Sequence, residues 1–445
     1  IEPSHFDEAT AYVAATRYKT DDTKPYLLKT NDYGVTWKII TTGIRENDYT
    51  RVIREDPNKK GLLVCGTETG VYVSFNDGVL WQPLQLNLPC TPVHDMQFQK
   101  REHDLVIATH GRSFWILDDI TPLYQFAEAS KSKYFLYQPR TTVRWQGNSF
   151  YKIGMQEGEN APHGAVMRYY LTQKPDTELM MKFFTSNGDT IITYSSTKDK
   201  KGEAIKISKE FYQDKKLKRP GILPVDTGMN VFVWDLRYPD AKNIEEGNKA
   251  KLDGGIIGPY SPPGKYIAKL FLKDSLLAER NFEIIRDPRI EATDADLQTQ
   301  FDFLMKINRK LSAVHEGINK IRQATKHVNQ SLALIKDSAL VKEVKKVTQP
   351  FLDSLKKVEE ELTQPKAVTN YDLFNFPNQL DDKLSALSSI ASAADSKPTQ
   401  SMYEVFNVLS ARADVQLNKM ESILVSQLPA VNKIIEDKKL YIISK

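Results

Sequence analysis

Apolar and polar residues follow two different periods along this chain, and the period changes near Thr293. Before that residue, short apolar runs alternate with polar positions, which is the two-residue period of half-buried β-strands. The clearest runs come in pairs around a turn of small residues, at 62–74 and 105–117, with a looser pair at 11–30. After Thr293, apolar residues recur about every 3.6 positions, as on one face of an α-helix. The pattern therefore predicts a multidomain chain, β then α.

Residues 1–125 contain an eight-residue segment twice. The copies are TNDYGVTW at 30–37 and SFNDGVLW at 74–81, and their tryptophans are 44 residues apart. That spacing is typical of one four-stranded blade of a β-propeller. Glycine relieves the steric cost of a tight turn, and a carboxylate or amide two residues earlier accepts backbone N–H groups across it. The turn residues are Thr30, Asp32, Gly34, Thr36 and Trp37 in the first copy, and Ser74, Asn76, Gly78 and Trp81 in the second.

Segments of this kind, known as Asp boxes, are mainly folding devices and leave the chemistry open. The paired strands and the two boxes amount to two or three blades, whereas a closed propeller needs at least about four. An open stack leaves a sheet face and sheet edges without a partner. We therefore expect residues 1–125 to be the C-terminal blades of an Asp-box β-propeller whose other blades lie upstream, on the same precursor or on a separate chain.

The remaining residues divide into three predicted regions. Residues 126–160 are a polar connector with scattered aromatic side chains, and 161–290 contain short alternating strands separated by turns. Such a series predicts an immunoglobulin-like β-sandwich, here without the cysteine pair that joins the sheets of antibody domains. Residues 291–445 hold four amphipathic segments, which predict a C-terminal helical bundle. Thr293 is the expected N-cap of the first helix, with Asp296 as the third helical residue.

Composition excludes several classes of protein. The 445 residues include 40% hydrophobic and 27% charged residues, which is ordinary for a soluble protein. A net charge of +4 without a basic stripe argues against nucleic acid as a partner, and the basic run at 215–219 indicates a solvated loop. No apolar stretch reaches the roughly 18 residues that predict a transmembrane span. The two cysteines, Cys65 and Cys90, are expected to be separate buried thiols, with a disulfide as the alternative in an oxidising compartment.

Motifs for catalysis and for metal binding are incomplete. The loop at 258–266 has the composition of a phosphate loop but the wrong spacing, and we interpret it as a turn into a strand. The segment 315–319 begins like the helix of a zinc protease and lacks the second histidine. The seven histidines form no cluster with ligand spacing. We therefore predict no cofactor, no metal site and no catalytic residue.

The best candidates for ligand binding lie in the segment THGRSFW at 109–115 and just after it. A histidine and an arginine at a strand end, beside an aromatic ring, can hydrogen-bond and stack on a sugar or a peptide. In the alternative interpretation, the histidine and arginine satisfy backbone groups of a turn, while the aromatic residues pack between blades. The candidate residues are His110, Arg112, Trp115 and Asp118.

A family resemblance rests on four segments. DLVIATHGRSFWILDD at 104–119 and REDP at 54–57, with the two Asp boxes, resemble the end of the propeller in large bacterial sortilin-like proteins with Asp-box (BNR) repeats. The segments 371–384 and 395–399 resemble the closing helical region of that family, whose members are often labelled glycosyl-hydrolase-like. The resemblance implies export from a bacterial cell, to the periplasm, the cell surface or the medium, and a propeller upstream.

Two functions are consistent with these features. In the first, which we favour, the chain is a non-catalytic binding or scaffolding module that presents surfaces to an envelope protein complex or a glycan. In the second, it is part of a glycoside hydrolase whose active-site funnel lies mostly in upstream blades, with two carboxylates flanking the scissile bond. No feature of the sequence pairs the candidate carboxylates across a cleft; these are Glu55, Asp56, Glu68, Asp118 and Asp119.

Overall fold

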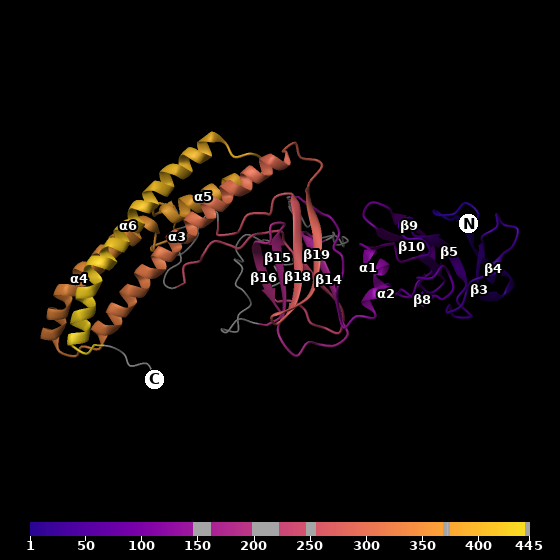
Figure 1. Cartoon of the computed structure of the whole chain (residues 1–445), viewed down its shortest axis with the longest axis horizontal. Coiled ribbons are helices and arrows are strands. Elements are labelled where there is room, and N and C mark those ends of the chain that lie inside the picture. The colour runs from indigo at the N-terminus through magenta and orange to yellow at the C-terminus, as the bar shows by residue number, and fades with distance from the viewer. Residues whose placement is uncertain (146–161, 198–221, 246–254, 368–371, 373, 441–445) are drawn as a thin grey trace. The chain divides into compact units, whose positions relative to one another are not determined.

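A computed structural model describes residues 1–145, 162–197, 222–245, 255–367, 372 and 374–440 (Figure 1). The chain consists of β structure followed by α structure, as predicted. It divides into two compact units, Ile1–Ser132 and Lys133–Lys445. Among the residues so described, no helix combines the length and the apolar character that a membrane crossing requires.

The first unit consists of three antiparallel sheets that follow one another along the chain. Strands that are neighbours in sequence are also neighbours in each sheet, so each sheet is a simple meander. The first sheet comprises β1 (Glu2–Pro3), β2 (Ala11–Arg17), β3 (Asp22–Thr30) and β4 (Lys38–Ile39). The second comprises β5 (Thr50–Glu55), β6 (Leu63–Thr67), β7 (Val71–Ser74) and β8 (Gln82–Pro83). The third comprises β9 (Val93–Gln99), β10 (Asp104–Thr109) and β11 (Phe114–Leu117). The short helices are η1 (Tyr18–Thr20), α1 (Thr121–Tyr124) and α2 (Phe126–Ala129).

The first eight-residue repeat forms the turn between β3 and β4. Asp32 accepts a hydrogen bond from Oγ1 of Thr30 at 2.8 Å, and from the backbone N and Oγ1 of Thr36 at 2.9 and 2.5 Å. These bonds, made mainly to the charged form, lower the pKa of Asp32 to about 2. Gly34 has a φ of 88°, a region that side chains rarely adopt.

The second repeat forms the same turn between β7 and β8. Oδ1 of Asn76 accepts hydrogen bonds from Oγ of Ser74 at 3.0 Å and from the backbone N of Leu80 at 2.9 Å. Gly78 has a φ of 82°, close to that of its counterpart. A side-chain oxygen in the same place therefore closes both turns, supplied by a carboxylate in one and by an amide in the other.

The tryptophans that end the two repeats have different surroundings. Trp81 is 2% exposed, and its indole N–H donates to the carbonyl of Ile40, which directly follows the first sheet, at 2.6 Å. Trp37 is 44% exposed, and its N–H donates to the carbonyl of Gly34 in its own turn at 3.1 Å. The second sheet has the first sheet packed against it, whereas no preceding sheet exists among the residues described here to cover Trp37.

Two apolar cores join the three sheets. The core between the first and second sheets comprises Tyr12, Leu27, Ile40, Ile44, Ile53, Leu63, Cys65, Tyr72 and Trp81. The core between the second and third comprises Val52, Leu62, Val64, Val71, Val73, Leu88, Val93, Met96, Phe98, Leu105, Ile107 and Ile120. Successive residues of β6 belong to opposite cores, as the two-residue period of a strand requires. The middle sheet is consequently buried on both faces.

The second unit begins with two sheets that share one core. The first sheet has the order β12 (Tyr134–Leu136), β14 (Ala165–Leu171), β17 (Gly228–Trp234). The second has the order β13 (Thr142–Arg144), β19 (Ser275–Arg286), β18 (Gly264–Leu272), β15 (Leu179–Thr185), β16 (Thr190–Ser195). β13 runs parallel to β19, and the other pairs are antiparallel. Aromatic rings from both sheets meet in the core, where Phe183 and Trp234 stack with centroids 4.5 Å apart.

Alternation of apolar residues located several of these strands. The runs at 165–171 and 264–272 coincide with β14 and β18. β12 and β13 lie inside 126–160, the segment expected to be a connector, and each pairs with a strand of these sheets. With three residues apiece, they are too short to show a period.

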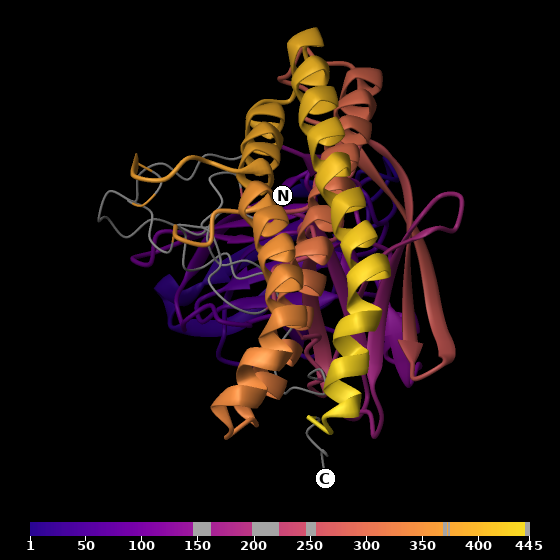
Figure 2. The ribbon, with the colours of Figure 1, turned by 90° about the vertical axis from the view of Figure 1, so that its left-hand side faces the viewer.

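Four long helices complete the second unit, and Figure 2 shows them along their length. They are α3 (Asp294–Ala333), α4 (Ser338–Leu362), α5 (Leu380–Ser392) and α6 (Gln400–Asp437). They share one apolar core, in which α3 contacts the other three helices. Thr293 caps α3 as predicted: its Oγ1 accepts from the backbone N of Asp296 at 3.2 Å, and Asp296 accepts from the backbone N of Thr293 at 3.0 Å.

Candidate functional site

In the first unit, the predicted binding residue His110 lies in the turn between β10 and β11. Its ring packs against that of His94, on β9, with centroids 4.8 Å apart, and both residues are exposed. The pKa of His94 lies below its ordinary value, chiefly because of partial desolvation and then because of the charges of Arg51 and His110. His94 is therefore a neutral imidazole at pH 7, which can both donate and accept a hydrogen bond.

The charges of two side chains from the second sheet, Arg51 and Glu68, act on His94. Arg51, on β5, forms an ion pair with Glu68, with 2.5 Å between Nη2 and Oε2. Its guanidinium lies 5.6 Å from the ring centroid of Tyr18 and 5.1 Å from that of Tyr49, and the two rings stack on each other. A neutral imidazole can hydrogen-bond to the hydroxyl groups of a sugar, and tyrosine rings suit its apolar faces. This histidine cluster comprises Tyr18, Tyr49, Arg51, Glu68, His94 and His110.

The other predicted binding residues lie in the same turn, on β11 and just after β11. Trp115 is partly buried against the core between the second and third sheets, and its indole N–H donates to the carbonyl of Arg112 at 2.9 Å. The Arg112 side chain is exposed in the turn. Asp118 follows the opposite end of β11, about 13 Å of extended chain away from the turn. The partners of His110 were not recognised from the sequence, because they come from three sheets at separations that follow no motif spacing.

Three of the carboxylates considered for glycoside hydrolysis have partners that are part of the fold. Glu55 is buried and accepts from Oγ of Ser4 at 2.6 Å and from the backbone N of His5 at 2.9 Å. Asp56 is buried and accepts from the Tyr124 hydroxyl at 2.8 Å. Glu68 is held by the arginine of the histidine cluster. Each of the three therefore has a structural role that accounts for it.

The incomplete motifs have structural explanations. The loop at 258–266 leads into β18, and Gly264 at the start of that strand has a φ of 152°. His315 is buried on α3, where its Nδ1 contacts the carbonyl of Lys242 at 2.5 Å, and burial lowers its pKa to about 4. In the described part of the chain, no three His, Cys, Asp or Glu side chains come together as a metal site.

The two cysteines are free thiols, and only one of them matches the expectation. Cys65 is buried in β6, as predicted, and burial raises its pKa well above the ordinary value. Cys90 is exposed, because it lies in the connection between β8 and β9 and not in a strand. The basic run at 215–219 lies outside the described residues.

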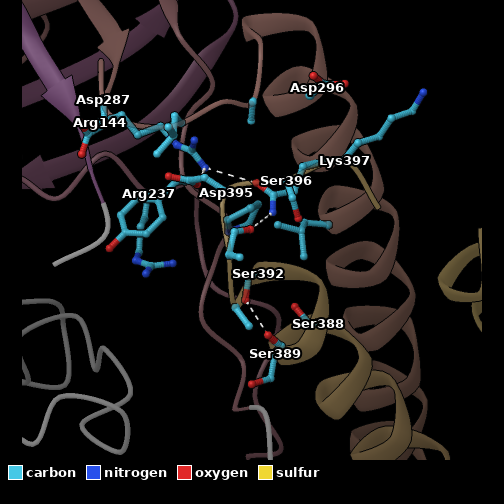
Figure 3. A pocket seen from close by; sticks show the side chains of 18 of the residues that line it. Arg144, Arg237, Asp287, Asp296, Ser388, Ser389, Ser392, Asp395, Ser396 and Lys397 are labelled. Atoms are coloured by element: carbon cyan, nitrogen blue, oxygen red, sulfur yellow. Dashed lines mark hydrogen bonds and ion pairs between the residues drawn. The ribbon is translucent and has the colours of Figure 1, made fainter. Parts of the chain in front are cut away.

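The second unit contains a cavity of about 1150 Å³ between the end of β13, the segment 257–260, the beginning of α3 and the loop after α5 (Figure 3). Arg144, the last residue of β13, lines it with a side chain that is 4% exposed. Its Nη2 is 2.9 Å from Oδ1 of Asp395, which is buried as well, and 3.4 Å from Oε1 of Gln300. Its Nε and Nη1 are buried without a hydrogen-bond partner.

A second arginine lies on the same aromatic ring. The guanidinium of Arg237 is 3.6 Å from the ring centroid of Tyr260, and that of Arg144 is 5.8 Å from it. Nη1 of Arg237 donates to the carbonyl of Gly258 at 2.8 Å, while its Nε is buried without a partner. Burial lowers the pKa of Arg144; Asp395 and Tyr260 oppose that effect, and the charge of Arg237 adds to it.

The loop after α5 is held in place from α3. Nε2 of Gln300 donates to the carbonyls of Ala391 and Ala394 at 2.8 and 2.6 Å, which places Asp395 beside Arg144. Hydroxyl groups of the same loop and of the end of α5 line this side of the cavity, and they belong to Ser388, Ser389, Ser392 and Ser396. The cavity thus has two arginines on one side and serine hydroxyls on the other, and Asp287, Glu291, Asp296 and Lys397 also line it.

Comparison with known proteins leaves the family open. No family model matches the chain, and no curated protein matches it. Among solved structures, it is similar to an ancestral GH74 enzyme, with 13% identity and a TM-score of 0.23 over 43% of this chain and 26% of that one. The matched region spans about a quarter of that enzyme, and a TM-score this low assigns neither a fold nor an activity to this chain.

Proposed function

We propose that this chain is a non-catalytic binding or scaffolding module of an exported bacterial sortilin-like protein, and that its first unit is part of an Asp-box β-propeller. The observation that carries the proposal is the repetition of one sheet-to-sheet contact. The first sheet packs on the second, and the second on the third, through faces at equivalent strand positions. Radial repetition of such meanders is what a propeller requires.

The outer face of the first sheet corresponds to the face of the second sheet that the first sheet covers. Val13 pairs with Leu28 across β2 and β3, as Cys65 pairs with Tyr72 across β6 and β7. Cys65 and Tyr72 are buried beneath the first sheet. Val13 and Leu28 are partly exposed. Ile39 on β4 faces the same way as Leu28, with which it pairs, and is 59% exposed. We infer that another sheet of the same kind covers this face.

The outer face of the third sheet is exposed, although the equivalent face of the second sheet is covered by the third. Phe114 and Ile116 of β11 occupy the positions of Val71 and Val73 in β7, since Trp115 and Tyr72 pair with equivalent residues of the preceding strand. The two valines are buried under the third sheet, while Phe114 is 77% and Ile116 60% exposed. Two complementary bare faces fit further blades, on the same precursor or on a separate chain.

The remaining parts fit presentation of surfaces better than hydrolysis. We propose that the two facing sheets of the second unit form an immunoglobulin-like sandwich, which together with the histidine cluster would contact an envelope protein complex or a glycan. Hydrolysis needs two carboxylates across a cleft. The structural partners of Glu55, Asp56 and Glu68 weigh against those residues, so the non-catalytic role is the better supported one.

Site-specific photo-cross-linking in the source bacterium tests the proposal. A photoreactive phenylalanine analogue replaces Ile39 on the bare face of the first sheet, and in a control replaces Val415 of α6, which is similarly exposed. We expect position 39 to cross-link to a peptide that lies next to an eight-residue Asp box, in the same polypeptide or in a partner, and position 415 not to do so. Identical cross-links at the two positions, or cross-links at position 39 only to proteins without such boxes, would refute it.

A further inference from the structure

We propose that the cavity of the second unit is an anion-binding site in which Arg144 and Arg237 hold an oxyanion, a carboxylate or phosphate group carried by a polar ligand. This site lies within the second unit and does not depend on the propeller. It is built from β13, the segment 257–260, α3 and the loop after α5 (Figure 3).

In the described part of the chain, the two arginines of the cavity wall have one carboxylate partner between them. Among the described residues, Arg144 forms an ion pair with Asp395, whereas Arg237 forms no ion pair and donates to the carbonyl of Gly258. Three further acids and one lysine also line the cavity, namely Asp287, Glu291, Asp296 and Lys397. Asp287 receives two nitrogens of Arg289, and Asp296 belongs to the capping box of α3. Two guanidinium groups on one tyrosine ring therefore repel each other, and a bound anion would relieve that repulsion.

Hydrogen-bond donors lead to the same conclusion. A guanidinium has five N–H donors and no acceptor, and a buried donor without a partner destabilises the fold. Nε and Nη1 of Arg144 and Nε of Arg237 are such donors. The ion pair with Asp395 uses only Nη2 of Arg144, so a structural salt bridge does not account for this arrangement. If the two side chains turn toward the cavity, oxygen atoms of a ligand would satisfy these three buried nitrogens with charge-assisted bonds.

The dimensions of the cavity indicate a ligand larger than one ion. A volume of about 1150 Å³ lies just above the usual range for small-molecule sites, which is about 300–1,000 Å³. The serine hydroxyls opposite the arginines can hydrogen-bond to the uncharged polar groups of such a ligand. An acidic sugar and a sugar phosphate share the chemistry that this wall would recognise, namely an oxyanion on a polyhydroxylated body.

Isothermal titration calorimetry on the full chain, at constant ionic strength, tests the site. The probes are glucuronate and inorganic phosphate, with glucose as the neutral control. Arg237→Gln removes a guanidinium that has no ion-pair partner, and Arg280→Gln on β19 removes an equal charge outside the cavity. A second variant, Arg144→Gln with Asp395→Asn, removes the buried charge pair together and so leaves no unpaired ion behind.

Saturable binding of glucuronate or of phosphate that weakens at least tenfold in Arg237→Gln and is unchanged in Arg280→Gln would support the site. Binding of glucuronate alone would identify the recognised group as a carboxylate, and binding of phosphate alone as a phosphate. The proposal is overturned if neither probe binds saturably to the unmodified chain, or if Arg237→Gln binds as tightly as that chain does. Should the double variant fail to fold, the comparison of Arg237→Gln with Arg280→Gln still decides.

Discussion

A single oxygen atom closes each of the two equivalent turns in the first unit, and the two turns differ in what that oxygen belongs to. In the first turn it is a carboxylate oxygen of Asp32, and in the second an amide oxygen of Asn76. The carboxylate makes one more bond, to the hydroxyl of Thr36. The neutral amide is nonetheless sufficient in the second turn, where the apolar core around Trp81 adds support.

We expect Asp32→Ala to destabilise the first sheet and Asp32→Asn to do so less, because the amide oxygen can keep the bond to the backbone N–H of Thr36. The folded-state pKa of about 2 lies below the ordinary value of 3.8, so the carboxylate stabilises the turn above that ordinary value. This stabilisation is lost as the pH falls from about 4 to about 2. Hydrogen exchange in peptides covering 22–40, followed with increasing urea, measures the effect. Equal losses in the two variants would contradict the expected role of the oxygen.

Asp381 shows the opposite perturbation in the helical bundle. It lies in the first turn of α5, fully buried, and burial raises its pKa to about 7; the charge of Asp382 acts in the same direction. Below pH 7 the folded chain therefore keeps this carboxyl protonated, whereas the unfolded chain ionises it above about pH 4. The folded state binds the additional proton in that window, so this group makes the fold less stable as the pH rises from about 4 to about 7.

Asp381→Asn should therefore stabilise the second unit at pH 8, by a few kcal/mol, and have little effect near pH 4. The amide has the shape of the protonated acid, and its oxygen can still accept from the backbone N of Asp382, as Oδ1 does at 2.7 Å. Chemical denaturation of the full chain and the variant at both pH values measures the difference. His315, whose lowered pKa acts in the opposite direction, cancels when the two chains are compared. If the difference in the free energy of unfolding between the variant and the unmodified chain is the same at pH 4 and at pH 8, Asp381 titrates normally.

At the scale of elements, the contact between the first two sheets depends on a glycine outside either strand. Gly43 lies in the connection between β4 and β5 with a φ of 99°, and a Cβ placed there would be 2.3 Å from the carbonyl oxygen of Trp81. The neighbouring residue Thr42 accepts a hydrogen bond from the backbone N of Trp81 at 2.9 Å. The connection thus lies directly against the second Asp-box turn, and backbone atoms on both sides leave little room to adjust.

We expect Gly43→Ala to destabilise the first unit by about 3 kcal/mol or more, from backbone strain and overpacking together. Gly111 is the matched control, because its φ is 90° and a Cβ there would meet nothing within 4 Å. Gly111→Ala should cost only the strain of the left-handed backbone, about 1 kcal/mol. Hydrogen exchange in peptides of the first unit, measured at increasing urea concentrations, gives the free energy of unfolding lost in each of the two variants. If the two substitutions cost the same, close approach to Trp81 has no role in the packing.

At the scale of the whole molecule, the two units differ in how their cores are completed. The second unit buries its apolar faces within itself, in one core between two sheets and one among four helices. The first unit repeats one sheet contact and leaves a bare face at each end of the series. The proposed propeller and the proposed anion site therefore belong to different units and can be tested, and rejected, independently.

Features that depend on near neighbours in the chain were predictable. The alternation that predicted β14 and β18 and the capping box at Thr293 each involve residues within a single element. The candidate binding sites were predicted poorly for the opposite reason. His110 was identified, but His94 lies on a different strand of the same sheet, Arg51 comes from the second sheet, and Asp118 lies beyond the far end of β11.

The sequence by itself determined the order of β and α structure, the two equivalent turns and the start of the first long helix, because these follow from hydrogen bonds and periodicities within a few residues. Only the tertiary structure decided that Trp81 is buried while Trp37 is not, and that Arg144 meets Asp395 across 251 positions of the chain. Burial and charge balance depend on which surfaces are brought together. That is a property of packing between distant segments, which no local pattern of residues encodes.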